Sequence, residues 1–309
     1  MQIRILGSGA GGGFPQWNCN GPNSSAVRQG RPGFRARTQS SLAVSADGEH
    51  WALLNASPDL RQQINETADL WPRADKGPRN SPIKAVVLTN ADVDHIVGLI
   101  HLREAQRFGV YGSERVLATL AANSVFQVLA ADKVPRIPLQ AGQPVAIAGD
   151  GLDLGLTVEA FEVPGKVALY LEDAAKPGFG STAGDTIGLE VTEARSGRSF
   201  FYVPGCARMD DALAARLRGA ALVFFDGTLY TEDEMIRQGL MPKTGSRMGH
   251  MNMSGPDGSI AAFAPLGVGR RVFVHINNSN PVLDEASAER KAVETAGWEV
   301  GYDGMEIRL

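Results

Sequence analysis

The sequence predicts an α+β protein with a four-layer αββα sandwich, in which two mixed sheets pack against each other and helices cover their outer faces. Two observations carry this prediction. Predicted strands dominate along the chain, with helices between them, and both halves close with units that combine a strand and a helix. No internal repeat or linker divides the 309 residues, so we expect one domain with two halves, about 1–150 and 151–309.

The first half opens with a short apolar strand at residues 2–6, which ends at the glycine-rich turn GSGAGGG. The glycine spacing matches a dinucleotide-binding fingerprint, but that motif needs a helix directly after the turn. Pro15 and Asn18 prevent such a helix. We therefore expect a tight bend rather than a nucleotide site, followed by a long polar loop over residues 14–38.

The other elements follow from apolar periodicity and from turn residues. The apolar run KAVVLT, for example, is typical of a strand that is covered on both faces. The first half is predicted to continue with strands at 41–44 and 51–55, a helix at about 59–66, a strand at 84–89, a helix at 98–108, a strand at 110–111 and a helix at 113–120. The second half is predicted to contain strands near 145–148, 155–163, 167–172, 187–192 and 199–204, a helix at about 209–217, a strand at 221–225, a helix at about 256–264, a strand at 271–275, a helix at 284–296 and strands near 298–301 and 305–308.

Composition argues against several classes of protein. Thirty Lys and Arg against 34 Asp and Glu give a net charge of −4, without the broad basic surface that nucleic-acid binding needs. The N-terminal residues lack the apolar core of a signal peptide, and no apolar run is long enough to span a membrane. Only Cys19 and Cys206 could pair, which argues against a disulfide framework. We therefore expect a soluble, cytoplasmic protein without nucleic-acid or membrane partners.

The segment TNADVDH at residues 89–95 carries the sharpest chemical signal, because it follows the end of a buried strand. Asp92 and Asp94 lie two positions apart within it. Carboxylates this close repel each other unless a proton or a cation lies between them. The segment therefore indicates a metal site, and a polar loop that caps the following helix is the alternative.

Four apolar strands end at a residue that can bind a metal ion. These residues are His95, Cys206, Asp226 and His275. Oxygen and imidazole ligands without clustered thiolates suit iron(II), manganese or zinc, and two histidines with one carboxylate favour non-haem iron. Asp94, His95 and His275 form such a set, although His275 would also fit a core histidine bonded to the backbone. His50 and His101 are assigned to structure.

The TNADVDH segment resembles the T-H-x-H-x-D-H signature of the metallo-β-lactamase superfamily, with Asn90 and Asp92 in place of the first two histidines. A more specific resemblance, to the coenzyme PQQ synthesis protein B family, covers nearly the whole chain. It rests on the blocks GSGAGGGFPQWNCN, TQSSLAVS, LLNASPDLRQQI, LTNADVDHIVGL, FFDGTLYTEDEM, MGHMNMSG and HINNSNPVL. By resemblance, Cys206 and Lys166 stand where the superfamily often has a bridging aspartate and a histidine.

This resemblance implies a role in the biosynthesis of pyrroloquinoline quinone (PQQ). It implies an Fe(II)- and O₂-dependent hydroxylase that acts on the tyrosine ring of a peptide-derived, cross-linked Glu–Tyr intermediate. Zinc could substitute for iron. A carrier for PQQ or its precursor and a metal-dependent hydrolase are the alternatives. The expected partner is a small amino-acid-derived substrate, and contacts with other proteins of the pathway or a homodimer stay open.

The expected site residues fall into three groups. The metal ligands are Asp94, His95 and His275, with Asn90, Asp92 and Cys206 as further candidates. The catalytic group comprises Asp92, Asp226 and His250; His250 is the preferred acid or base because an imidazole exchanges protons near neutral pH, although a helix-capping role is the alternative. The substrate-binding group comprises Arg28, Arg35, Arg37, Asn277 and Asn278. The arginines would bind carboxylates in bidentate geometry, and a solvated loop is the alternative for them.

The resemblance also bears on Cys19, because relatives have a C-x-C-x-x-C arrangement in this segment that can bind a structural zinc. Here Gly21 and Ser24 stand where the further thiolates would be. One thiolate cannot make a closed tetrahedral site. We therefore expect no structural zinc at Cys19.

Overall fold

Two seven-stranded sheets form the centre of a computed structural model that describes residues 1–309. The first sheet has the order β14-β1-β2-β3-β4-β5-β6, and the second has the order β13-β12-β11-β10-β9-β8-β7. The strands of the first sheet are β1 (Gln2–Gly7), β2 (Ser41–Ser45), β3 (Trp51–Leu54), β4 (Ile83–Val87), β5 (Gly109–Gly112), β6 (Arg136–Pro138) and β14 (Glu306–Arg308). Those of the second are β7 (Pro144–Gly149), β8 (Leu152–Glu162), β9 (Ile187–Glu193), β10 (Ser199–Val203), β11 (Leu222–Asp226), β12 (Arg270–Val274) and β13 (Glu299–Val300).

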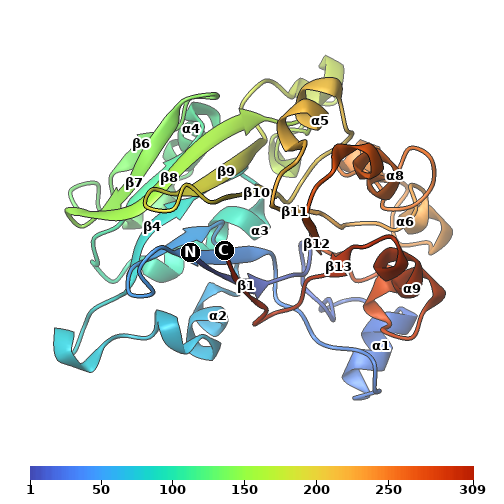
Figure 1. The fold of residues 1–309 in the computed structure, drawn as a ribbon, viewed down its shortest axis with the longest axis horizontal. Helices are drawn as coiled ribbons and strands as arrows, with labels where there is room; N and C mark the ends of the chain where they lie inside the picture. Colours follow the sequence, from blue (N-terminus) through green and yellow to red (C-terminus); the bar gives the residue numbers. More distant parts are fainter.

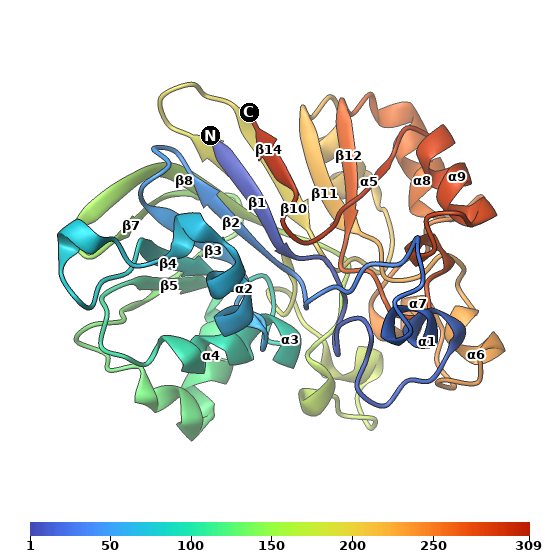
Figure 2. The same cartoon turned by 90° about the horizontal axis from the view of Figure 1, so that it is seen from below.

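Helices cover the outer faces of the two sheets. The α-helices are α1 (Pro22–Arg28), α2 (Leu60–Glu66), α3 (Val93–Ile96), α4 (Glu114–Ala122), α5 (Asp211–Leu217), α6 (Glu234–Arg237), α7 (Gly245–Met248), α8 (Ser259–Phe263) and α9 (Ala288–Thr295). Short 3₁₀ helices lie at Ala68–Leu70, Ala74–Lys76, Val97–Leu102, Ser124–Val128, Leu169–Leu171, Pro177–Gly180, Ala264–Leu266 and Pro281–Leu283. Figure 2 shows α2, α3 and α4 on the side of the first sheet, and α5, α8 and α9 on the side of the second. The predicted αββα sandwich is confirmed.

Three apolar clusters hold these layers together. One lies between the sheets, and the other two lie between each sheet and its helices. Neighbouring residues of β11 show how a strand contributes to two of them. Phe224 faces the cluster between the sheets, while Phe225 packs on Phe263 of α8 with ring centres 4.8 Å apart. Strands that are buried on both faces in this way are continuously apolar, as the sequence indicated.

The chain ends close to where it began (Figure 1). Strand β14 pairs antiparallel with β1, where Gln2 lies opposite Arg308. The last strand therefore belongs to the sheet of the first half, although the rest of the second half builds the other sheet. No helix combines the length and the apolar character that crossing a bilayer would require.

Three predicted elements differ from the structure. The long loop at 14–38 contains α1, which has Pro22 in its first turn, where proline is favourable. Residues 98–108 form a 3₁₀ helix only to Leu102. Residues 167–172 form a 3₁₀ helix at Leu169–Leu171 instead of a strand, and the Tyr170 hydroxyl in it donates to the Ala91 carbonyl oxygen (2.8 Å) just before α3.

Candidate metal centre

The metal-binding candidates lie after the carboxyl ends of parallel strands from both sheets. Asp94 and His95 belong to α3, which follows β4, and His275 directly follows β12. Ligands commonly bind at such strand ends in open sheets. His275 has a φ of 57°, a backbone conformation that is rare for residues other than glycine and that occurs at functional sites. One ligand atom from each of the three side chains lies within 4.8 Å of the others.

The hydrogen bonds of His95 determine which of its ring nitrogens is free. Its Nδ1 lies 2.7 Å from Asn90 Oδ1, and the same oxygen accepts a hydrogen bond from the backbone N–H of Asp92 (3.0 Å). Asn90 Oδ1 is therefore an acceptor, His95 Nδ1 carries the proton, and Nε2 of the neutral ring carries a lone pair. This Nε2 is buried without any hydrogen-bond partner and lies 3.8 Å from Asp94 Oδ2.

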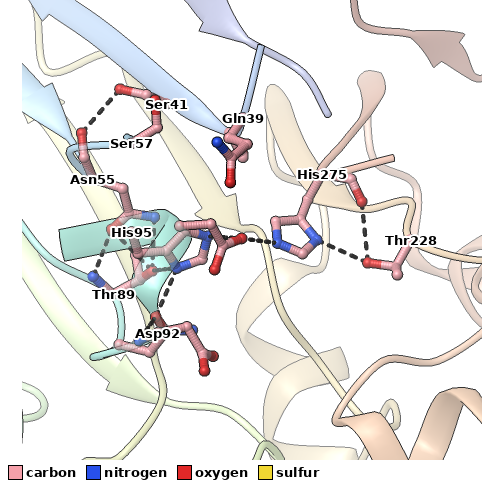
Figure 3. Close-up of polar contacts among 12 residues, drawn as sticks. Gln39, Ser41, Asn55, Ser57, Thr89, Asp92, His95, Thr228 and His275 are labelled. Carbon is pink, nitrogen blue, oxygen red and sulfur yellow. Dashed lines mark hydrogen bonds and ion pairs between the residues drawn. The ribbon is translucent and has the colours of Figure 1, made fainter. Parts of the chain in front are cut away.

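His275 directs its Nε2 at the same carboxylate. Its Nδ1 lies 2.8 Å from the Thr228 hydroxyl (Figure 3). That hydroxyl lies 2.6 Å from Asp226 Oδ1. The Thr228 hydroxyl can donate to Asp226 while it accepts from His275 Nδ1, and His275 Nε2 lies 3.1 Å from Asp94 Oδ2, where a proton or a metal ion on Nε2 completes the contact. The two Nε2 atoms and the Asp94 carboxylate therefore lie close together, and a metal ion between them would satisfy all three.

The pKa shifts agree with a preference for positive charge at this point. Burial lowers the pKa of His95 to about 4, so the ring is neutral at physiological pH, as a metal ligand must be. Burial opposes ionisation of Asp94, but the charge of His95 and the hydrogen bond and charge of His275 lower its pKa below the usual range. Burial would also lower the pKa of His275, but its hydrogen bond to Asp94 and the Asp94 charge raise it.

These residues fit a divalent metal ion. The unpaired Nε2 of His95 is the observation that decides this, because a buried polar atom without a partner is costly. Two imidazole nitrogens and one carboxylate suit iron(II), manganese and zinc. Asn90 does not bind the metal in this arrangement, since its side-chain oxygen holds His95 in place.

A second cluster adjoins the first at His275. Asp226 is fully buried, and its carboxylate accepts hydrogen bonds from the Thr228 hydroxyl (2.6 Å) and from the backbone N–H groups of Thr228 and Cys206 (both 3.0 Å). Nδ1 of His250 lies 2.7 Å from Asp226 Oδ2. Burial opposes ionisation of Asp226, but the charge and hydrogen bond of His250 lower its pKa. Because Asp226 is saturated with donors, this cluster orients the His250 ring and leaves Nε2 free to act on a ligand.

A cavity of about 260 Å³ joins the two clusters. Asp94, His250 and His275 line it, together with Asp92 and Gly11 of the glycine-rich turn. A Cβ at Gly11 would lie 3.4 Å from Asp94 Oδ2, so this turn lies directly against the metal-binding residues. The backbone N–H of Leu169 donates to Asp92 Oδ1 (3.3 Å), which connects the 167–172 segment to the cavity wall.

The three arginines expected to bind substrate do not line this cavity. Arg28 donates to backbone carbonyls near α1, and Arg35 pairs with Glu285 at the surface (3.0 Å). Arg37 is buried beneath the glycine-rich turn, where it donates to the Ser8 hydroxyl (2.8 Å) and to the Gly301 carbonyl, and burial lowers its pKa to about 10. The hydrogen bonds and the ion pair of these arginines are all made within the fold, and substrate binding by them stays a prediction.

Of the two asparagines and two cysteines that the sequence singled out, one asparagine lies at the cavity. Asn277 lines the cavity, whereas Asn278 does not line it and donates to Gln16 Oε1 (2.6 Å). Cys206 is fully buried, and its thiol donates to the Arg208 carbonyl oxygen (3.1 Å). Burial and the neighbouring Asp226 charge raise the Cys206 pKa, and Cys206 does not line the cavity. Cys19 Sγ accepts a hydrogen bond from the Gly21 N–H (3.3 Å), and the absence of a structural zinc there stays a prediction.

Sequence reasoning missed the polar residues that support the site. Asn55, at the end of β3, exchanges hydrogen bonds with Thr89 at the end of β4: its side chain donates to Thr89 Oγ1 (2.9 Å) and accepts from the Thr89 N–H (2.9 Å). Thr228 connects the two clusters through its hydroxyl (Figure 3). Their position in the sequence could have indicated them, because Asn55 and Thr89 each follow a buried strand, just as His275 does.

Comparisons with known proteins agree with this fold and site. A family model described as a β-lactamase superfamily domain matches residues 50–276. Proteins called coenzyme PQQ synthesis protein B from Xanthomonas axonopodis pv. citri and Rhodopseudomonas palustris are 50% and 52% identical, and each match covers 100% of both proteins. The crystal structure of Zn²⁺-bound PqqB from Methylobacterium extorquens superposes with a TM-score of 0.94 at 49% identity and complete coverage of both chains. The chain therefore belongs to the β-lactamase superfamily and, within it, to the coenzyme PQQ synthesis protein B family.

Proposed function

We propose that this protein acts in PQQ biosynthesis as an Fe(II)- and O₂-dependent hydroxylase of the tyrosine ring in a peptide-derived, cross-linked Glu–Tyr intermediate. The observation that carries the proposal is the set of Asp94, His95 and His275, in which two imidazole Nε2 atoms face one carboxylate beside a cavity. The names of the full-length relatives support the pathway. The donor set supports iron, since two histidines and one carboxylate with open positions are typical of non-haem iron oxygenases.

Asp94, His95 and His275 would hold the iron. Bound Fe(II) supplies the one-electron steps that a spin-paired phenol cannot undertake with O₂ directly. Asn90 holds the ring orientation of His95, and Thr228 holds that of His275, so both Nε2 atoms stay directed at Asp94. Such supporting hydrogen bonds fix the tautomers of metal-binding histidines.

His250 carries the proton transfer in this proposal. Its Nδ1 proton is directed at Asp226 (2.7 Å), and its Nε2 is free to accept the proton of the substrate phenol. The buried Asp226 carboxylate stabilises the imidazolium that results, in the way that a carboxylate supports a histidine base in other enzymes. Asp226 is thus a positioning residue, because it is fully buried and does not line the cavity.

The reaction consumes an external reductant. One oxygen atom of O₂ enters a C–H bond of the ring to give C–OH, and the other leaves as water after it takes up two electrons and two protons. The chain contains no disulfide, and its two cysteines are buried, so we assign the two electrons to a separate small-molecule donor. Ascorbate serves this purpose in a test.

The decisive experiment is anaerobic loading with Fe(II), followed by the cross-linked Glu–Tyr compound, ascorbate and isotopically labelled O₂. We expect a product whose mass includes labelled oxygen, and no such product from His275→Ala. Lys176→Met, a change at an exposed lysine far from the metal ligands in sequence, is the control that should keep full activity.

Three outcomes would overturn the hydroxylase proposal. Binding of the compound without any chemical change would favour a carrier. Undiminished labelled product from His275→Ala would show that the reaction does not use this cluster. Zinc-dependent turnover of a generic phosphodiester would favour a hydrolase instead.

A further inference from the structure

Two lysines enter the cavity from segments that carry none of the metal-binding residues. Lys166 lies between β8 and β9, and Lys243 lies between α6 and α7. Lys243 is half-buried and forms no ion pair with any carboxylate of the chain. A half-buried ammonium group without a partner, on the wall of a cavity, is available to an anionic ligand.

Lys166 is held in position by its surroundings. Its Nζ lies 3.2 Å from Glu172 Oε1 and donates to the Val167 carbonyl oxygen (3.2 Å). Glu172 is itself fixed by two hydrogen bonds from Arg247 (2.8 and 3.2 Å). The stem of Lys166 passes so close to Gly249 that a Cβ there would lie 3.0 Å from the Lys166 Cγ. An ammonium group has three protons, so one remains for a ligand.

The charge balance of the cavity favours an anion. Its only acidic lining residues are Asp92 and Asp94, and Asp94 belongs to the metal-binding set. With a divalent cation bound there, positive charge exceeds negative charge around the cavity. A ligand with several carboxylates would restore the balance.

The apolar part of the wall is made of flexible side chains. Met235, Met241, Met248 and Leu169 line the same cavity as the two lysines. Thioethers are polarisable and pack favourably against aromatic rings. The cavity therefore combines a surface for a ring with cations for acidic groups.

We propose that Lys166 and Lys243 bind the carboxylates of an aromatic, multiply carboxylated ligand, while the three methionines contact its ring. This inference rests on the proposed function, since it places the substrate of that function in the same cavity. It transfers the role of carboxylate binding from the three arginines to the two lysines. Lys243 and Lys166 thereby determine which aromatic compounds the site accepts.

The test uses the full-length chain loaded with redox-inert Zn²⁺ and two probes, PQQ, which carries three carboxylates, and its trimethyl ester. Lys243→Met should weaken PQQ binding by about tenfold or more, as expected for the loss of one charge-assisted hydrogen bond. Lys166→Met should do the same, and the double variant should lose more than either. Binding of the ester should be unchanged in all of them, and Lys243→Arg should restore much of the PQQ affinity.

Lys176→Met is the matched control, because Lys176 lies in the same β8–β9 segment but is exposed and pairs with Asp173 (3.4 Å). The inference is overturned if Lys243→Met binds PQQ as tightly as the unmodified chain, or if the ester loses affinity by the same factor. Failure of the proposed function would give a different result from failure of this inference. Iron-loaded protein would then give no labelled product, while the binding of PQQ would still depend on the two lysines. Conversely, hydroxylation by the double variant with an unchanged KM would contradict this inference alone.

Discussion

The two polar clusters that meet at His275 differ in how their hydrogen bonds are satisfied. In the first cluster, His95 Nε2 is buried without a partner, and His275 Nε2 faces the Asp94 carboxylate at 3.1 Å. In the second cluster, Asp226 accepts from two backbone N–H groups, from the Thr228 hydroxyl and from His250. The first cluster therefore lacks a positive charge, whereas the second is complete as it stands.

This difference indicates that the two clusters have different chemical roles, although they consist of the same residue types. Each cluster contains two histidines and one aspartate, and each meets the distance requirement for a metal site. Unsatisfied lone pairs favour a cation, while a saturated carboxylate favours a fixed imidazole that transfers protons. We therefore assign the metal to Asp94, His95 and His275, and proton transfer to His250.

The change with the largest expected effect removes a ligand from the first cluster. His95→Ala should weaken metal binding by at least about 100-fold, because it removes one of the three ligands. Loss of a residue that only orients a ligand has a smaller effect on metal affinity, about 10- to 100-fold. Elemental analysis after anaerobic loading and dialysis measures the retained metal. His101→Ala is the control, since His101 lies on the same segment but contacts the Pro58 carbonyl oxygen. Full metal content in His95→Ala would contradict the assignment.

A change in the second cluster should affect the rate and not the metal. His250→Gln keeps a similar shape but cannot accept and return a proton, so kcat should fall by about 10²–10⁴-fold. Metal content should stay at the level of the unmodified chain. Simultaneous loss of metal would show that the second cluster also supplies a ligand, and the comparison of the two clusters would fail.

Arg37 provides a contrast between structural and ligand-binding cations. Arg37→Met should lower the free energy of unfolding by about 3 kcal/mol, because it removes buried hydrogen bonds to Ser8 and Gly301 and leaves the buried Asp303 carboxylate without a nearby cation. Urea denaturation measures this effect. Lys243→Met, in contrast, should leave stability nearly unchanged. A raised KM with normal stability for Arg37→Met would support the original substrate-binding interpretation instead.

The smallest expected effect concerns the contact between the β8–β9 segment and α7. Hydrogen bonds from Arg247 lower the pKa of Glu172 to about 2, from an ordinary value of 4.5. Its stabilisation, about 1 kcal/mol for such a partly buried pair, is therefore complete above pH 4.5 and is lost as the pH falls through about 2. Glu172→Gln should remove this contribution at neutral pH, which urea denaturation can measure. An identical loss at pH 2 and pH 7 would contradict the ion-pair explanation.

The sequence predicted the features that depend on strand ends and on rare residues. Asp94, His95 and His275 stood out because a histidine after an apolar strand is unusual, and the strands themselves were visible as apolar runs. Long-range contacts were not predictable. Arg37 occurs in a polar, arginine-rich stretch, yet it lies beneath the glycine-rich turn because Gly301 and Ser8 offer it hydrogen bonds from the two ends of the chain. Nothing in the sequence around Lys243 indicates its position, since only the fold brings the segment before α7 to the cavity that Asp94 lines.

The central claim is that one divalent metal ion binds at Asp94, His95 and His275. Anomalous X-ray scattering at the iron absorption edge, from crystals of this protein grown and loaded with Fe(II) under anaerobic conditions, tests it most directly. We expect a single anomalous peak in contact with Nε2 of His95, Nε2 of His275 and the Asp94 carboxylate. A peak at His250 and Asp226, or no peak near His95, would contradict the account.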